Sequence, residues 1–321
     1  MQKRALGDSG LMVASLCFGG NVFGWTIDQA QSFPLLDAFV ERGFNFVDTA
    51  DVYSTWGGPN NKGGESETII GAWFKKSGKR DQVVLATKVG HDMTPEKRGL
   101  SAAHILRSVD ESLQRLRTDY IDLYQSHKDD LTVAPDETLR AYQKLIEQGK
   151  VRAIGASNFT ADRLKMSLQI ADAAGLPRYC SLQPEYNLYD RAGFEQELGP
   201  LCLKENVGVI SYYSLARGFL SGKYRSEADV NKSARGPRVA EVYFNDRGFR
   251  ILAALDTVAA VHGSNPARIA LAWLMSRPGI TAPIASATTL PQLDDLMAAA
   301  DVALTDGDIA KLDAASDYST P

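Results

Sequence analysis

VVLATKV (residues 83–89) is followed along the chain by SAAHILRSVDESLQRLR (101–117) and YIDLYQSH (120–127), and these segments decide the fold class. The first and third are short apolar runs, typical of strands that are buried on both faces of a parallel sheet. The second begins with Ser101, a favourable helix N-cap, and carries apolar residues at helical spacing: Ile105, Leu106, Val109, Leu113 and Leu116. The three segments predict a β-α-β unit.

The same alternation extends along the chain in both directions. Further short apolar runs are LCFGG (16–20), FNFVDTA (44–50), VRAIGASNF (151–159), SLQPEYN (181–187), GVISYYSL (208–215) and ITAPIASA (280–287). Amphipathic segments such as 137–150 and 160–175 lie between them and end at glycine, a common helix stop. Eight strands alternating with helices predict a (β/α)8 TIM barrel, with residues 1–321 as one domain.

A doubly wound open sheet is the second candidate, because it uses the same β-α units. None of the 27 glycines forms a Gly-x-Gly motif, so the Rossmann fingerprint is absent, and there is no P-loop. Residues 4–15 surround the turn Gly7–Gly10 and predict a β-hairpin outside the barrel. Residues 218–246, after the seventh strand, are polar and basic, and predict a long functional loop without secondary structure.

Composition excludes several classes of protein. Apolar residues make up 44% and charged residues 23%, as in soluble globular proteins. The net charge is −4 and there is no long Lys/Arg run, which argues against nucleic-acid binding. Three widely spaced cysteines argue against a disulfide scaffold or a cysteine-based zinc site. With no signal-peptide pattern and no long apolar stretch, we expect a soluble cytoplasmic protein that does not contact membranes.

Four polar residues fall at or near the carboxyl ends of neighbouring predicted strands, where TIM barrels carry their active sites. They are Asp48, Tyr53, Lys88 and His127. Each alone is more often structural, but a lysine inside a strand buried on both faces needs a carboxylate partner, and Asp48 is suitably placed. The joint occurrence therefore predicts one catalytic site.

The chemistry of this set fits reduction of a carbonyl group. Hydride delivery to carbon builds alkoxide charge on oxygen, so a proton donor is needed, and Tyr53 is suited to that role once a cation stabilises its phenolate. Lys88 supplies the cation, Asp48 orients Lys88, and an N–H of His127 contacts the substrate oxygen. A positioned acid of this kind contributes about 10²–10⁴ in rate.

The chain resembles the aldo-keto reductases over nearly its whole length, as a bacterial-type member related to the potassium-channel β-subunit-like branch. Motifs in the family's order are GFNFVDTADVYS, GESETIIG, LATKVG, DYIDLYQSH, IGASNF, QPEYN, SYYSLARGFLSGKY and PARIALAWLM. The resemblance implies an NAD(P)H-dependent oxidoreductase that reduces an aldehyde or ketone, sugar-derived carbonyls included, or catalyses the reverse. It implies Tyr53 as the catalytic acid/base, completed by Asp48, Lys88 and His127, and a cofactor extended across the barrel top.

The resemblance also implies cofactor residues. For the nicotinamide it points to Ser157, Asn158, Gln183 and Tyr212, with Tyr213 as the alternative to the last. Leu215, Arg217 and Lys223 correspond to the pyrophosphate segment, and the 218–246 loop is expected to cover the cofactor. Ser286, Thr288 and Gln292 correspond to the adenosine-phosphate motif, which here lacks the usual arginine and asparagine. We therefore expect a modest preference for NADP, with NAD also usable.

Substrate-binding candidates are Trp25, Trp56, His91 and Lys128, in the loops after the first four strands. Many relatives have Trp-Pro after the histidine, whereas Lys128-Asp129-Asp130 stands here and predicts a more polar substrate rim. The substrate and the oligomeric state stay open. One alternative function is a non-enzymatic, cofactor-binding partner protein of the channel β-subunit type. The other, a metal-dependent barrel hydrolase, is disfavoured because the four histidines form no His-x-His pair, so no metal is expected.

Overall fold

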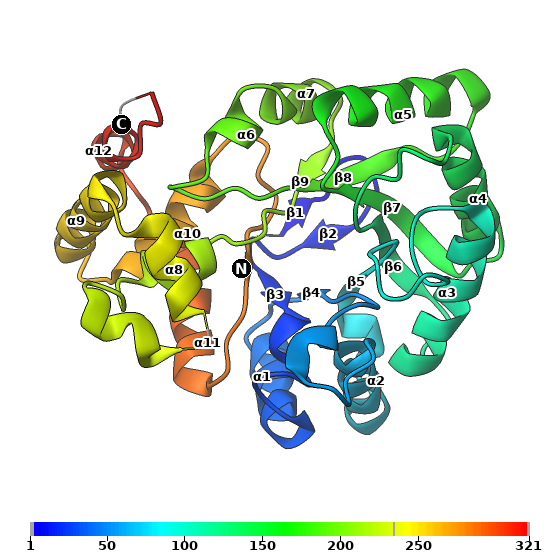
Figure 1. Ribbon diagram of the computed structural model, residues 1–321, viewed down its shortest axis with the longest axis horizontal. Coiled ribbons are helices and arrows are strands. Elements are labelled where there is room, and N and C mark those ends of the chain that lie inside the picture. Colours follow the sequence, from blue (N-terminus) through cyan, green and yellow to red (C-terminus); the bar gives the residue numbers. More distant parts are fainter. Residues whose placement is uncertain (1–2, 234, 320–321) are drawn as a thin grey trace.

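A closed ring of parallel strands forms the centre of the computed structural model, which describes residues 3–233 and 235–319 (Figure 1). Its strands are β3 (Cys17–Gly19), β4 (Phe46–Asp48), β5 (Val84–Val89), β6 (Ile121–Ser126), β7 (Val151–Ser157), β8 (Tyr179–Gln183), β9 (Gly208–Val209) and β10 (Ile284–Ala285). Residues 279–284 close the ring, because Ile284 donates to the Ser211 carbonyl at 2.8 Å and pairs with Cys17 of β3. The predicted (β/α)8 barrel is confirmed.

Helices surround the ring on its outer side (Figure 1). They are α1 (Gln29–Glu41), α2 (Glu65–Ser77), α3 (Ala102–Leu116), α4 (Pro135–Glu147), α5 (Ala161–Ala174), α6 (Ala192–Glu195), α7 (Leu198–Lys204), α8 (Gly236–Tyr243), α9 (Asp246–Val261), α10 (Pro266–Ser276), α11 (Leu290–Met297) and α12 (Asp306–Ala315). The predicted caps form: the side chains of Ser101 and Thr160 accept N–H bonds at the starts of α3 and α5, and Gly175 ends α5 in the left-handed conformation.

The predicted N-terminal hairpin, β1 (Arg4–Ala5) with β2 (Met12–Val13), plugs the end of the barrel at which the strands begin. Its fully buried Leu6 and Val13 pack into a cluster with one residue from each of the eight strand segments: Cys17, Phe46, Ala86, Leu123, Ala153, Cys180, Ile210 and Ala282. Gly7 is required at the tip, because its φ is +54° and a Cβ there would lie 2.2 Å from the Cys180 carbonyl oxygen. The opposite end of the barrel carries the polar residues that lie at the carboxyl ends of the strands.

The observed elements differ from the predicted ones in extent. The run 181–187 stops being a strand at Gln183, since Pro184 has no N–H for the ladder. The run 208–215 keeps only β9, because Tyr213 has a φ of +49° and turns the chain. Residues 218–246, expected to lack secondary structure, contain most of η4 (Ala216–Ser221), all of η5 (Glu227–Lys232) and α8.

Asp122 links three strands near the ends at which they begin. Its carboxylate is almost fully buried and pairs with Arg80 and with Arg152, each at 2.8 Å, and it also accepts the Leu85 N–H at 3.0 Å. Both guanidinium groups lie over the Tyr120 ring, with each Cζ 3.9 Å from its centroid. One buried carboxylate therefore joins β5, β6 and β7.

We predict that Asp122→Asn lowers the free energy of unfolding by about 2–4 kcal/mol, because two guanidinium groups lose their carboxylate. The loss stays below that of a fully buried pair, since Arg152 is half exposed. Urea unfolding followed by circular dichroism measures it. The exposed neighbour Asp119 provides the control, and Asp119→Asn should stay within about 0.5 kcal/mol of the parent. Equal stabilities of the two variants would contradict the role of Asp122.

Candidate active site

The carboxyl ends of β4 and β5, with the loop after β4, bring three of the four predicted catalytic side chains into direct contact. The Lys88 ammonium is fully buried and lies 2.6 Å from Oδ2 of Asp48. It also donates to the Tyr53 hydroxyl at 2.8 Å and to the Thr49 carbonyl at 2.9 Å. A buried ammonium is thus fully satisfied, as the sequence required.

The hydrogen bonds of Lys88 determine what the Tyr53 hydroxyl does with its own proton. Lys88 has three N–H donors, and all three are used, so the Tyr53 oxygen accepts one of them. The proton of Tyr53 is directed to Oδ2 of Asp48 over 3.3 Å, a long bond for an O–H donor. The Tyr53 proton is therefore engaged only in a long hydrogen bond to Asp48.

The pKa of the Tyr53 phenol is raised well above its usual value, first by burial and then by the nearby negative charge of Asp48. Lys88, the cation expected to stabilise the Tyr53 phenolate, lies within hydrogen-bond distance of the Tyr53 oxygen. The positive charge of Lys88 is already matched by Asp48, and burial disfavours the phenolate. Tyr53 consequently stays protonated at neutral pH.

His127, directly after β6, lies beside this group. Its ring centroid is 6.0 Å from that of Tyr53 and 5.1 Å from that of His91. Burial, and then the Lys88 charge, holds the pKa of His127 well below 6.5, so its imidazole is neutral at pH 7. A neutral imidazole has one N–H donor and one acceptor nitrogen, which suits it to hydrogen-bond a carbonyl or hydroxyl oxygen.

Two glutamines complete the surroundings of Asp48. Its second oxygen, Oδ1, accepts from Nε2 of Gln125 at 3.1 Å and from Nε2 of Gln183 at 2.9 Å. The sequence reasoning missed Gln125, although it is a polar residue inside a fully buried strand, the same signal that identified Lys88. Gly155 makes room for it, since a Cβ there would lie 3.0 Å from the Gln125 side chain. Gln183, predicted to bind nicotinamide, has its amide N–H groups on Asp48 and Gln125.

The remaining residues predicted for the nicotinamide lie together at the ends of β7 and β9. Asn158 adopts a left-handed conformation with φ of +55° and donates to the His127 carbonyl and to the Ser157 hydroxyl. The Tyr212 hydroxyl donates to Oδ1 of Asn158 at 2.8 Å. The Ser157 hydroxyl in turn donates to the Gln183 carbonyl. A hydrogen-bonded row thus leads from the tetrad across the barrel end.

The residues predicted for the adenosine phosphate form a separate group. Ser286 donates to Oδ1 of Asn21 at 2.6 Å, and Thr288 donates to Oε1 of Gln292. Within the described part of the chain, no hydrogen bond links these residues to the tetrad.

The basic residues of the 218–246 loop divide into two kinds. Three of them pair with carboxylates: Arg225 with Asp256, Lys232 with Asp229 and Arg238 with Glu241. Lys223 and Arg235, like the preceding Arg217, form no ion pair with any residue that the structure describes, and lie over the rings of Tyr224, Trp25 and Tyr213. Leu215, which precedes Arg217 in the predicted pyrophosphate segment, is partly buried against the core. The unmatched cations provide positive charge for an anionic ligand.

The predicted substrate residues form a rim beside Tyr53. Trp56 lies edge-on to Tyr53 and to Trp25, with ring centroids 5.8 and 6.0 Å apart. His91 adjoins His127 on the other side, and Lys128 forms an ion pair with Asp92. The rim therefore combines an aromatic wall with charged and hydrogen-bonding groups.

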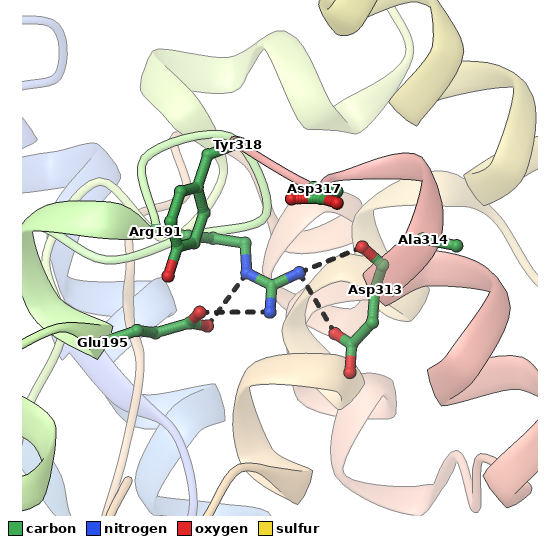
Figure 2. Close-up of a pocket in the computed structure, with 6 residues that line it drawn as sticks. All are labelled: Arg191, Glu195, Asp313, Ala314, Asp317 and Tyr318. Atoms are coloured by element: carbon green, nitrogen blue, oxygen red, sulfur yellow. Dashed lines mark hydrogen bonds and ion pairs between the residues drawn. The ribbon is translucent and has the colours of Figure 1, made fainter. Parts of the chain in front are cut away.

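A pocket beneath α12 lies apart from these residues (Figure 2). Arg191 crosses it and pairs with Glu195 at 2.9 Å and with Oδ1 of Asp313 at 3.3 Å. Its Nη1 also donates to the Ser316 hydroxyl at 2.7 Å. The Arg191 charge is already paired with these carboxylates. We therefore interpret this pocket as a structural contact between the Arg191 segment and α12.

Two features of residues 3–233 and 235–319 bear on other functions. No helix among them is both long enough and apolar enough to cross a membrane. They contain no group of three or more His, Cys, Asp or Glu side chains arranged to hold a metal ion.

Comparison with known proteins places the sequence in a family. The chain is 35% identical over 312 residues to an uncharacterized oxidoreductase, YrpG, of Bacillus subtilis (strain 168), covering 95% of this chain and 92% of that protein. It is 32% identical over 309 residues to a probable voltage-gated potassium channel subunit beta of Arabidopsis thaliana (94% and 92% covered). It is likewise 32% identical over 308 residues to the aldo-keto reductase YhdN of Bacillus subtilis (strain 168), covering 92% and 88%. Residues 15–317 match the Aldo/keto reductase family, and the chain is an oxidoreductase that belongs to it.

Proposed function

We propose that this oxidoreductase uses NAD(P)H to reduce an aldehyde or ketone to an alcohol, or catalyses the reverse, with Tyr53 as general acid/base. The observation that carries the proposal is the hydrogen bond that Lys88 donates to the Tyr53 oxygen, which directs the phenolic proton into a long bond to Asp48. Asp48 and Lys88 are positioned by strands, and Gln125 and Gln183 hold Asp48. Hydrogen bonds within the protein therefore orient these side chains without any contribution from the substrate.

In the proposed reaction the substrate oxygen lies between Tyr53 and His127. NAD(P)H, when bound, supplies the hydride for the carbonyl carbon. As negative charge grows on the oxygen, the O–H bond of Tyr53 breaks and the O–H bond of the alcohol forms. Lys88, which already donates to the Tyr53 oxygen, then stabilises the phenolate. The high pKa of Tyr53 keeps the acid form available for this step.

The chain's residues fit a dinucleotide. Ser157, Asn158 and Tyr212 offer amide and hydroxyl groups next to the tetrad, as a nicotinamide carboxamide requires. Arg217 and Lys223, without carboxylate partners in the described chain, would hold the phosphates. Ser286, Thr288 and Gln292 would face the adenosine end.

The rim favours a polar carbonyl substrate, and we propose a sugar or sugar-derived carbonyl. The Trp25–Trp56 wall suits the apolar face of a carbohydrate ring, and His91 and Lys128 with Asp92 suit its hydroxyl groups. The alternative, a non-catalytic partner of a channel, would require no such hydrogen-bonded group of Asp48, Tyr53 and Lys88.

Tyr53→Phe should lower turnover by at least about two orders of magnitude, because the proton donor is lost. Its affinity for NADPH should stay close to that of the parent, since the cofactor groups are untouched. Steady-state kinetics with an aldehyde panel and fluorescence titration of NADPH measure the two effects. Tyr189→Phe removes a hydroxyl that donates to the Val242 carbonyl and serves as the control. Near-normal turnover of Tyr53→Phe would reject the assignment.

Bound NADPH should protect the 218–246 loop from trypsin. The loop carries the unpaired Lys223 and Arg235, whose charges a phosphate would neutralise and order. Mass spectrometry should show slower cleavage after these two residues when NADPH is present, with cleavage outside the loop unchanged. Equal cleavage with and without NADPH would contradict a cofactor-covering role.

NADPH should bind modestly more tightly than NADH, with NADH still usable. Only neutral donors, Ser286, Thr288 and Gln292, stand at the adenosine-phosphate motif, and each is weaker than a charge-assisted contact. Thr288→Arg should raise the preference for NADPH by about one to two decades. Separate titrations with the two nucleotides measure the ratio. A ratio unchanged in Thr288→Arg would show that this position does not face the 2′-phosphate.

A further inference from the structure

A second buried ionic cluster lies behind the tetrad, between the ring and its helices. Glu67 of α2 is completely buried; it accepts from the Thr87 hydroxyl at 2.6 Å and pairs with Nε of Arg115 of α3 at 2.6 Å. Gly64, at the start of α2, leaves room for this arginine, since a Cβ there would lie 2.5 Å from its side chain. The ion pair is therefore complete without any further group.

Asp51 brings a second carboxyl group to the same cluster. It is 5% exposed, and its Oδ1 has no hydrogen-bond partner within the described structure. Five ionisable groups face it from the elements packed around it: Glu67 of α2, Arg115 of α3, Lys88 of β5, Tyr124 of β6 and Tyr142 of α4. Both nearby cations already have carboxylate partners, Glu67 for Arg115 and Asp48 for Lys88.

Asp51 is also tied to the catalytic groups through the backbone. Its N–H donates to the Lys88 carbonyl at 3.3 Å, and the Tyr53 N–H donates to the Ala50 carbonyl at 3.2 Å. Gly63 lies against the Asp51 carbonyl, so closely that a Cβ at position 63 would be 2.7 Å from that oxygen. The turn that carries Tyr53 is thus anchored at Asp51.

We propose that Asp51 is a positioning residue that holds the Tyr53 turn in place as a neutral carboxylic acid, and that loss of its proton to solvent releases the turn. An ionised Asp51 would be a second carboxylate facing Glu67, with no free cation and no hydrogen bond to Oδ1. Repulsion and desolvation then favour moving it toward water. Such a movement draws Tyr53 away from Lys88. The catalytic consequence rests on the proposed function, whereas the effect on folding does not.

The electrostatics support this direction. Burial first, and then the charge of Glu67, raises the pKa of Asp51 from 3.8 to about 8. Because the folded pKa lies above the unfolded one, the neutral acid stabilises the fold fully below pH 3.8, and this contribution is lost as the pH rises to about 8. Tyr53, whose pKa is raised well above 10, does not titrate in that range.

The test compares the parent with Asp51→Asn, which keeps a neutral group of the same shape at all pH values. With the turnover number measured at saturating NADPH and aldehyde, the parent should lose about tenfold between pH 7 and pH 9, as a single ionisation near pH 8 requires. Asp51→Asn should show no such decline. Asp301→Asn, at an exposed carboxyl, should keep the parental profile.

A second measurement separates this proposal from the proposed function. The thermal midpoint of the parent, measured without substrate, should fall relative to that of Asp51→Asn as the pH rises from 5 to 8, and the difference should then level off. Glu67→Gln, which removes the facing carboxylate, should move the levelling point to lower pH and serves if Asp51→Asn does not fold. Parallel stability profiles of the parent and both variants would overturn the proposal. If the thermal midpoints differ with pH as described but turnover of the parent does not decline between pH 7 and pH 9, then only the positioning role of Asp51 would be overturned.

Discussion

The buried ammonium of Lys88 is the constraint on which the rest of the structure depends. A charge of this kind is stable inside a protein only if every N–H has an acceptor and a carboxylate lies next to it. Asp48, Thr49 and Tyr53 meet these needs, and all three come from β4 and the loop after it. The register of β4 on β5, which sets Asp48 opposite Ala86, is therefore also the register that assembles the proposed catalytic group.

Asp48 in turn is held by residues from further around the ring. Gln125 comes from β6 and Gln183 from β8, so one carboxylate connects four strands through side-chain contacts. The strands of a barrel tilt and curve together, and side chains from non-adjacent strands meet in its interior. An open sheet would not bring the ends of β4 and β8 within hydrogen-bond distance.

Much of this architecture could be predicted from the sequence, because the strands are short buried runs and the helix caps are local signals. The contact of Lys88 with Asp48 could be predicted for the same reason, because Lys88 is charged at a position that the strand pattern buries. Three features could not be predicted from the sequence, because they depend on the surroundings of each residue in the folded chain. The role of Gln125 depends on the space beside Gly155, the raised pKa of Tyr53 on burial and on how Asp48 shares its charge, and the shortness of β9 on the turn at Tyr213.

The hairpin plug joins residues 6–13 to residues far along the sequence. Leu6 and Val13 share one cluster with Ala282, so the interior layer of the barrel is complete only when these distant segments are in contact. Contacts between residues so distant in sequence carry a large loop-closure entropy and slow the final folding step. During synthesis the hairpin leaves the ribosome before the ring that it packs against, and their shared cluster is complete only once Ala282 has been added. The barrel therefore acquires its native interior only after its eighth strand segment has been translated.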